Sequence, residues 1–200
     1  MKFTDDIAAS AACLVVEEGM EYGAAKRKAA RDFGSRVELP PNEAVEDAVR
    51  EHIALFCADT QPGELRALRE AAALWMQRLA EFRPHLSGAA WRGTATRLSA
   101  VHLDLYCDDP KAAEIALVNA GVDYDVGSID RPGRGGRGGR REPLNVLTVA
   151  EASRVLGEPV TLHLLLHDYD DQRGALKPDA RGQSWRGDLA ALQRLMEPSA

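Results

Sequence analysis

The sequence holds little cysteine and no long apolar run, and each shortage argues against a class of protein. Its 3 cysteines among 200 residues form no CxxC pair, which argues against a disulfide framework or a zinc ribbon and predicts buried thiols in a reducing compartment. No apolar run approaches the roughly 18 residues of a membrane-spanning helix. The first ten residues include two aspartates where a secretory signal carries basic residues. We therefore expect a cytoplasmic protein with no membrane segment.

Basic residues are in the minority as well. The 25 lysines and arginines stand against 31 aspartates and glutamates, so the net charge is −6. This balance argues against a protein that binds nucleic acid over its whole surface, although a local basic patch is compatible with it. The sequence also lacks a GxxxxGK[ST] phosphate loop and a GxSxG nucleophile elbow. Neither a P-loop NTPase nor an α/β-hydrolase is therefore indicated.

The first part of the chain shows helical periodicity. Apolar residues recur at helical spacing in four stretches, which glycine and proline separate. We predict four helices that begin at Thr4, near residue 21, at Asn42 and at Pro62, the last of them ending at Pro84. Together they form a helical region over residues 1–84.

The second part of the chain alternates between apolar and polar residues, which predicts strands. Residues 101–107 (VHLDLYC) place His102, Asp104 and Tyr106 on one strand face and apolar residues on the other. The predicted elements are strands at 88–92, 101–107, 122–127, 144–149 and 160–167, a helix at 110–120 and a closing helix at 189–196. The predicted fold class is α+β, with the helical N-terminal region packed on a mixed β-sheet of about five strands in a domain of residues 85–200.

The most informative stretch, WRGTATRLSAVHLDLYC, runs from Trp91 to Cys107. A turn at Gly93 and Thr94 follows the predicted strand 88–92, and the next strand has ionisable residues at alternate positions. The pattern resembles the nucleotidyltransferase-fold superfamily, in which a Gly-Ser or Gly-Thr turn precedes a strand with two acids one residue apart. Glycine lets the backbone approach a phosphate, and carboxylates at i and i+2 can hold two Mg²⁺ ions for phosphoryl transfer.

The resemblance implies roles for individual residues and a cofactor. If the protein is active, the cofactor is Mg²⁺. The catalytic residues are then Asp104 and His102. The implied metal ligands are Asp104, His102 and His163, and the implied nucleotide-binding residues are Gly93, Thr94, Arg97 and Ser99.

The acids are depleted compared with that superfamily. Its Ser-Asp-x-Asp run falls on residues 99–102 here, so Ala100 and His102 replace the two acids. A second register pairs His102 with Asp104 and keeps one acid. Three interpretations stay open: a metal site of His102, Asp104 and His163, a polar sheet face that binds no metal, and a site with displaced acids. The displaced candidates lie near strand ends: Asp108, Asp109, Asp168, Asp170 and Asp171.

The resemblance extends to a bacterial group of small nucleotidyltransferase-like proteins and covers most of the chain. It rests on EEGMEYGAAKRKAARDFG near the N-terminus, on RALREAAALWMQ, on FRPHLSGAAWRGTAT and on the closing stretch DDQRGALKPDARGQSWRGDLAALQRLM.

Two basic segments could bind RNA. Five arginines lie among glycines in residues 131–141, a composition that can bind single-stranded RNA through charge and stacking. The same composition is typical of a hairpin loop between strands, here over residues 128–142. The second segment, with Lys26, Arg27, Lys28 and Arg31, is typical of a solvated helix face. The residues predicted to contact RNA are Arg134, Arg137, Arg140 and Arg141.

The function we expect is that of a degenerate or weakly active nucleotidyltransferase-like protein. It would bind a nucleoside triphosphate or a polyphosphate-type ligand, as a pseudoenzyme does. One alternative is metal-dependent nucleotidyl transfer to an acceptor. Another is a module that binds RNA or protein without catalysis. The sequence leaves the oligomeric state open.

Overall fold

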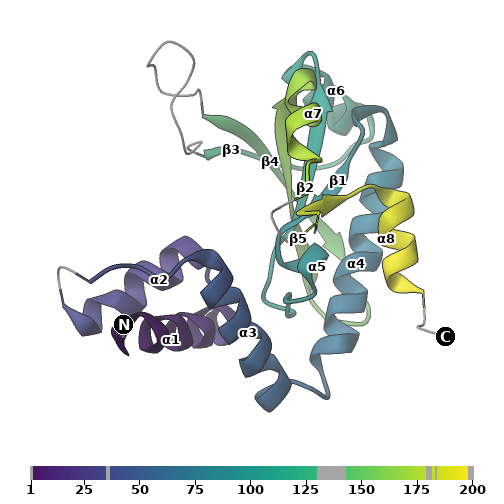
Figure 1. Ribbon diagram of the computed structural model, residues 1–200. Coiled ribbons are helices and arrows are strands. Elements are labelled where there is room, and N and C mark those ends of the chain that lie inside the picture. The colour runs from purple at the N-terminus through teal and green to yellow at the C-terminus, as the bar shows by residue number, and fades with distance from the viewer. Residues whose placement is uncertain (1, 35–36, 130–142, 179–181, 183, 198–200) are drawn as a thin grey trace, which may run out of the picture. The chain divides into compact units, whose positions relative to one another are not determined.

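The computed structural model describes residues 2–34, 37–129, 143–178, 182 and 184–197 (Figure 1). The fold class is α+β, as predicted: the described residues form eight α-helices and a mixed sheet of six strands. None of the described helices is both long enough and apolar enough to cross a membrane. The arginine-glycine residues 131–141 lie outside the described residues.

The chain divides into two compact units. Unit 1 comprises Met1–Arg66 and Gly93–Ser99, and unit 2 comprises Ala67–Arg92 and Ala100–Ala200. The sequence pattern placed a boundary at residue 84, whereas the units divide within the fourth helix and exchange the short segment 93–99.

Unit 1 is a helical cluster. Val45, Val49 and Ile53 recur every four residues and are buried against residues of the first helix such as Ile7 and Ala11. The helices of this unit are α1 (Lys2–Glu18), α2 (Tyr22–Ala30), η1 (Arg31–Phe33), α3 (Asn42–Phe56) and the first residues of α4 (Gln61–Arg78).

Segment 93–99 is integrated into unit 1 by contacts at two points. The buried side chain of Gln61 donates hydrogen bonds from Nε2 to the carbonyl oxygens of Gly93 (3.1 Å) and Ala95 (2.8 Å). Gly19, at the end of α1, has φ +67°, and a Cβ there would lie 2.8 Å from the carbonyl oxygen of Leu98. Glycine is therefore required at position 19 both by the backbone conformation and by the close approach of Leu98.

Unit 2 contains the sheet. Its strands are β1 (His85–Ser87), β2 (Val101–Cys107), β3 (Asp125–Ile129), β4 (Leu144–Ala152), β5 (Pro159–Asp168) and β6 (Arg186–Gly187). Besides most of α4, its helices are η2 (Ala80–Phe82), α5 (Gly88–Arg92), α6 (Pro110–Asn119), η4 (Tyr169–Asp171), α7 (Gln172–Ala175) and α8 (Leu189–Met196).

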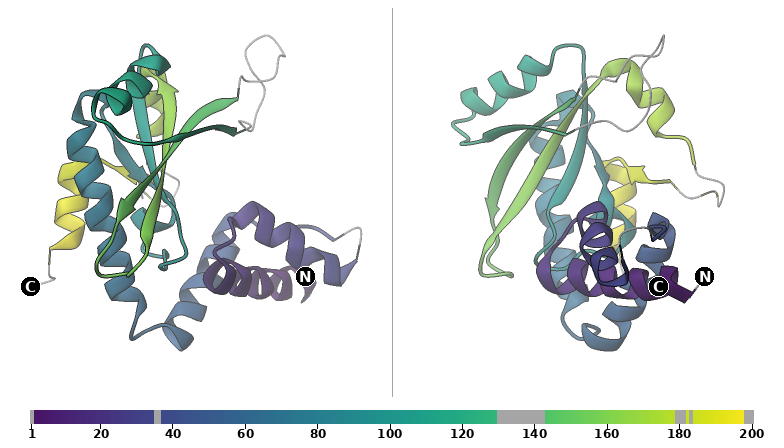
Figure 2. Two further views of the ribbon diagram at one scale, coloured as in Figure 1. Left: turned by 180° about the vertical axis from the view of Figure 1, so that it is seen from behind. Right: turned by 90° about the vertical axis from the view of Figure 1, so that its left-hand side faces the viewer.

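The strands follow the order β3-β4-β5-β2-β1-β6. Strands β2 and β5 are parallel and every other neighbouring pair is antiparallel. The apolar face carries Leu103 of β2 opposite Leu164 of β5, both fully buried. Helices α4 and α6 lie along this face (Figure 2), and the indole of Trp75 in α4 donates a hydrogen bond of 2.8 Å to Glu151 of β4. The opposite face is left for polar side chains.

Residues 88–92 form helix α5, and the predicted strand there is wrong. The strand lies just before it, as β1, and Gly88 with φ +68° ends β1. The guanidinium of Arg69 in α4 donates hydrogen bonds to the carbonyl oxygens of Ala90 (2.9 Å) and Trp91 (3.3 Å). This side chain satisfies carbonyl groups that a one-turn helix leaves open, a contact that local periodicity does not reveal.

The other predicted strands agree more closely with the structure. Residues 101–107 are a strand, as predicted, and the strands at 144–149 and 160–167 are each extended by one or more residues. The strand predicted at 122–127 begins later, at Asp125. The sequence pattern did not reveal β1 and β6, because strands of three and two residues are too short to show alternation. The sheet therefore has six strands where about five were predicted.

Candidate functional site

Polar side chains from five strands share one face of the sheet. The pairing registers set His102 opposite both His163 and Ser87, Asp104 opposite His85, and Tyr106 opposite His167. We call this set the polar face, and it consists of His85, Ser87, His102, Asp104, Tyr106, Thr148, His163, His167 and Arg186.

Asp104 lies at the centre of the polar face. Its side chain is only 4% exposed. One carboxylate oxygen accepts a hydrogen bond of 2.6 Å from Nε2 of His167, and the other lies 3.3 Å from a guanidinium nitrogen of Arg186. Ser87 also contributes to lowering the pKa of this carboxyl. Asp104 is therefore a buried anion with partners on several sides, as a buried charge requires.

The environment decides the charge of Asp104. Burial on its own raises the pKa of this carboxyl, but the hydrogen bond from His167 and the positive charge of Arg186 outweigh burial. The pKa of Asp104 therefore lies below its ordinary value, and the carboxylate is ionised at neutral pH.

Tyr106 connects the partners of Asp104. Its hydroxyl accepts a hydrogen bond of 2.8 Å from Arg186, and its ring stacks on that of His167 at a centroid distance of 5.2 Å. The ring of His85 meets it edge-on at 5.5 Å. Burial, and next the charge of Asp104, raise the pKa of Tyr106, so its hydroxyl stays protonated at neutral pH. The phenol positions both His167 and Arg186.

Two histidines form the more open part of the polar face. The rings of His102 and His163 lie 5.3 Å apart between centroids, and both side chains are half-buried. Thr148 Oγ1 lies 3.0 Å from Nδ1 of His163 and forms a hydrogen bond with it. Gly88 lies against His102, since a Cβ on it would be 3.3 Å from the imidazole Nδ1. These histidines are within reach of a molecule in solvent.

The three predicted metal ligands share a face but do not converge. His102 and His163 are neighbours, whereas the carboxylate of Asp104 is bound to His167 and Arg186. In the described part of the chain, one group of three side chains has ligand atoms within 4.8 Å of one another, and it contains none of these residues. No ion can therefore contact His102, Asp104 and His163 together without a rearrangement of Asp104.

The predicted nucleotide-binding residues all lie in unit 1. Gly93 has φ +83° and follows helix α5. Thr94 is 1% exposed, and its hydroxyl oxygen has no hydrogen-bond partner among the described groups. The backbone N–H of Arg97 donates a hydrogen bond of 2.9 Å to the carboxylate of Glu64. Ser99 Oγ accepts a hydrogen bond of 3.0 Å from the backbone N–H of Thr96. These hydrogen bonds stabilise the turn.

The displaced acids lie outside the polar face, and three of them (Asp108, Asp109 and Asp168) lie near Cys107 at the adjacent ends of β2 and β5. Asp109 is the N-cap of α6, where its carboxylate accepts a hydrogen bond of 2.9 Å from the N–H of Lys111. Asp108, Asp168 and Asp170 are exposed, and Asp171 is half-buried beside helix α7. None of them belongs to the polar face.

Sequence reasoning missed three members of the polar face that surround Asp104 and Tyr106. His167 has the same parity as His163 on one strand, so the sequence contained this signal. His85 was missed because β1 was predicted three residues too late. Arg186 lies on a strand of two residues, whose pairing with β1 leaves no local pattern.

Neither a protein-family model nor a curated protein nor a solved structure matches this chain. The polar face is therefore the basis for a proposed function.

Proposed function

We propose that the polar face binds the phosphate groups of a nucleotide, and that the protein is a nucleotidyltransferase-like binding protein without two-metal catalysis. The observation that carries the proposal is the engagement of Asp104. Asp104 is the one buried carboxylate among the described residues, and His167 and Arg186 already bind it. Asp125, which lies opposite Thr148 on the same sheet face, is exposed on the edge strand β3. A two-metal transfer requires further carboxylates to bridge and hold the ions.

The hydrogen-bonding groups of the polar face also favour an anionic ligand. Arg186 is permanently positive and compensates the charge of Asp104. What remains on the polar face is four imidazoles, two hydroxyl groups and the phenol of Tyr106. Imidazole and hydroxyl groups donate hydrogen bonds to phosphate oxygens, whereas a cation would meet few anionic ligands here.

The side chains of the polar face differ in solvent exposure, and this difference indicates where a ligand binds. Asp104 and Tyr106 are buried, so they serve as the fixed base of the site. His102, His163 and His167 are half-buried and present ring edges. A phosphate group therefore binds at the histidines, and the Asp104–Arg186 pair keeps the base of the site in place.

The test is a calorimetric and thermal-shift titration of the full chain with ATP, CTP, GTP and UTP, with and without Mg²⁺. We expect at least one nucleotide to raise the melting temperature without a requirement for metal, and to be recovered unchanged after incubation. Raising the salt concentration should weaken binding only modestly, because Asp104 compensates the charge of Arg186 and the phosphate is held mainly by hydrogen bonds.

Variants assign the binding to the polar face. His102→Gln and His163→Gln keep side chains of similar size and should weaken binding about tenfold each through lost hydrogen bonds to phosphate. Arg154→Gln removes one positive charge from an exposed position beyond β4 and serves as the control. Equal affinity in all variants would exclude the polar face as the site. Metal-dependent turnover that Asp104→Asn abolishes would instead establish the transferase alternative.

A further inference from the structure

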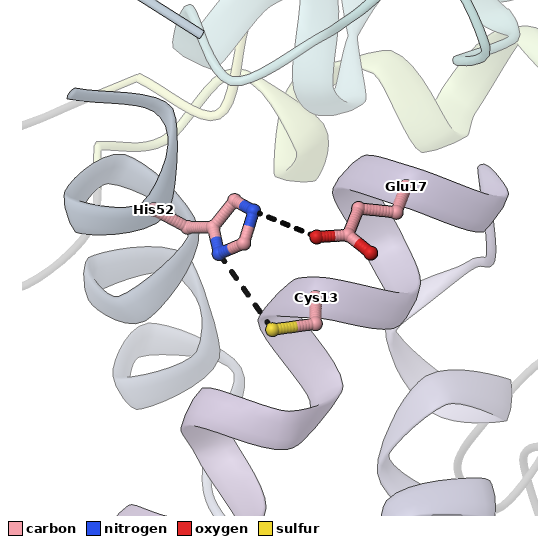
Figure 3. A group of neighbouring side chains, drawn as sticks. All are labelled: Cys13, Glu17 and His52. Atoms are coloured by element: carbon pink, nitrogen blue, oxygen red, sulfur yellow. Dashed lines mark hydrogen bonds and ion pairs between the residues drawn. The ribbon is translucent and has the colours of Figure 1, made fainter. Parts of the chain in front are cut away.

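A second group of chemically active side chains lies in unit 1, between α1 and α3 (Figure 3). Cys13 and Glu17 are one helical turn apart on α1 and therefore share a face. His52 comes from α3 and reaches both of them. Cys13 Sγ lies 3.6 Å from Nδ1 of His52, and Glu17 Oε1 lies 3.3 Å from Nε2 of the same ring.

The carboxylate fixes where the imidazole carries its proton. An ionised Glu17 only accepts hydrogen bonds, so it favours the proton on Nε2 of His52. The lone pair of Nδ1 then faces Cys13, and the thiol donates its S–H to it. Transfer of this proton gives a thiolate beside an imidazolium, whose charge Glu17 compensates.

We infer that Cys13 is a reactive thiol that forms mixed disulfides with small disulfide molecules, with His52 as its base and Glu17 as the residue that orients His52. In the reaction the Cys13 thiolate attacks one sulfur of a disulfide RSSR. The new Cys13–SR bond forms as the S–S bond breaks, and the leaving thiolate RS⁻ takes the proton that His52 received. One disulfide is consumed and one is formed, so no further oxidant is needed.

The arrangement favours a reactive thiol over a metal site. Cys13 and Glu17 contact opposite nitrogens of one ring, as Figure 3 shows. An ion bound at Nδ1 beside Cys13 would leave Glu17 on the other side of the imidazole. A thiol that donates to Nδ1 while a carboxylate holds Nε2 needs no such movement.

The other two cysteines are suitable internal controls. Cys57 is half-buried like Cys13, but it packs against the apolar core of unit 1. Cys107 is buried, and burial together with Asp109, Asp108 and Asp168 raises the pKa of its thiol. A reagent that reads accessibility alone would modify Cys13 and Cys57 alike, whereas proton transfer to His52 favours Cys13.

The experiment exposes the full chain to millimolar glutathione disulfide at neutral pH and follows each cysteine by peptide mass spectrometry. We expect Cys13 to form its mixed disulfide about tenfold faster than Cys57, because His52 lies 3.6 Å from the Cys13 sulfur and can take its proton. His52→Gln should reduce the rate at Cys13 to that at Cys57. Equal rates in the wild type, or no effect of His52→Gln, would overturn the inference.

A second measurement needs no variant that might fail to fold. Alkylation by iodoacetamide is followed from about pH 5 to 9 in the wild type, where an unassisted thiol loses reactivity below its ordinary pKa of about 8.5. Cys13 should remain reactive near pH 6 while Cys57 does not. The titratable groups at this position are Glu17 from α1 and His52 from α3, and Lys28 of α2 is paired with the neighbouring Glu18 at 2.6 Å.

Glu17 is tested as a positioning residue through the same pH profile. Glu17→Gln should move the profile of Cys13 toward that of Cys57, because the amide no longer selects the tautomer, and Glu17→Asp should restore part of it. A profile that Glu17→Gln leaves unchanged would exclude this role. Protection of Cys13 by micromolar Zn²⁺ that is lost in Glu17→Gln would overturn the inference in favour of a metal site.

Discussion

At the scale of single residues, the contribution of the Asp104 charge to stability can be tested without changing the size of the side chain. Asp104→Asn keeps that size but leaves the guanidinium of Arg186 without its counter-charge. Removing one partner of a buried ion pair typically costs about 3–5 kcal/mol. We expect a loss of this order in the free energy of unfolding, measured with urea at neutral pH.

The pH dependence of this loss follows from the lowered pKa of Asp104. The carboxylate stabilises the folded state above the ordinary aspartate pKa of about 3.9, and this stabilisation disappears as the pH falls through the lower folded value. The difference between wild type and Asp104→Asn should therefore shrink as the pH is lowered below about 4. A difference that stays constant down to pH 2 would contradict the assigned charge.

Much of the polar face was predictable from alternation alone. The pattern VHLDLYC is sufficient to put His102, Asp104 and Tyr106 on one side of a strand, because successive side chains point to opposite faces. The sequence alone could not show that His102 and His163 lie opposite each other, and the prediction assumed it. In the structure the parallel pairing of β2 and β5 sets these two residues opposite each other. The place of Arg186 in the polar face could not be predicted, because it depends on a contact with Tyr106, which lies 80 residues earlier in the chain.

At the scale of elements, strand β6 depends on a glycine. Gly187 pairs with Leu86 of β1, and a Cβ on it would lie 2.1 Å from the ring of Trp91. Gly187→Ala must therefore displace the indole of Trp91, whose Nε1 donates a hydrogen bond of 2.9 Å to the carbonyl oxygen of Ser184. We expect a loss of about 1–3 kcal/mol in the free energy of unfolding and a shift of the tryptophan fluorescence.

A glycine of the same unit provides the control. Gly174 lies in α7 and a Cβ on it would meet nothing within 4 Å. Gly174→Ala should leave stability unchanged or slightly raised. If Gly187→Ala behaved in the same way, the contact between Trp91 and β6 would be disproved.

Helix α5 illustrates why some elements escape sequence analysis. Its five residues begin with Gly88 and contain two alanines, which fit a strand end as well as a helical turn. The contacts from Arg69 of α4, about twenty residues earlier, decide between them. Long amphipathic helices such as α3 carry the periodic signal within themselves and were predicted to begin where they do.

At the scale of the whole molecule, the question is whether the two units unfold together. Gln61→Ala removes two hydrogen bonds and leaves the carbonyls of Gly93 and Ala95 without this donor. We expect unit 1 to lose about 1–3 kcal/mol. Hydrogen exchange should quicken at the core amides of α1 and α3 and stay unchanged in β2 and β5.

Equal acceleration in both units would show that the chain unfolds as one cooperative body. The matched control is Gln193→Ala on the exposed side of α8, which should change neither set of amides. The sequence pattern could not predict this division, because it places segment 93–99 beside the sheet strands that flank it.

The exchange of segment 93–99 also has a consequence for synthesis. A ribosome releases the chain in order, so α1, α2 and α3 emerge long before the residues that Gln61 and Gly19 contact. By the time Ser99 is free, α4, β1 and α5 have been made, but β2 and β5 at the centre of the sheet have not. Unit 1 is thus the first unit whose residues are all present, and unit 2 must wait for β5 and β6 at the far end of the chain.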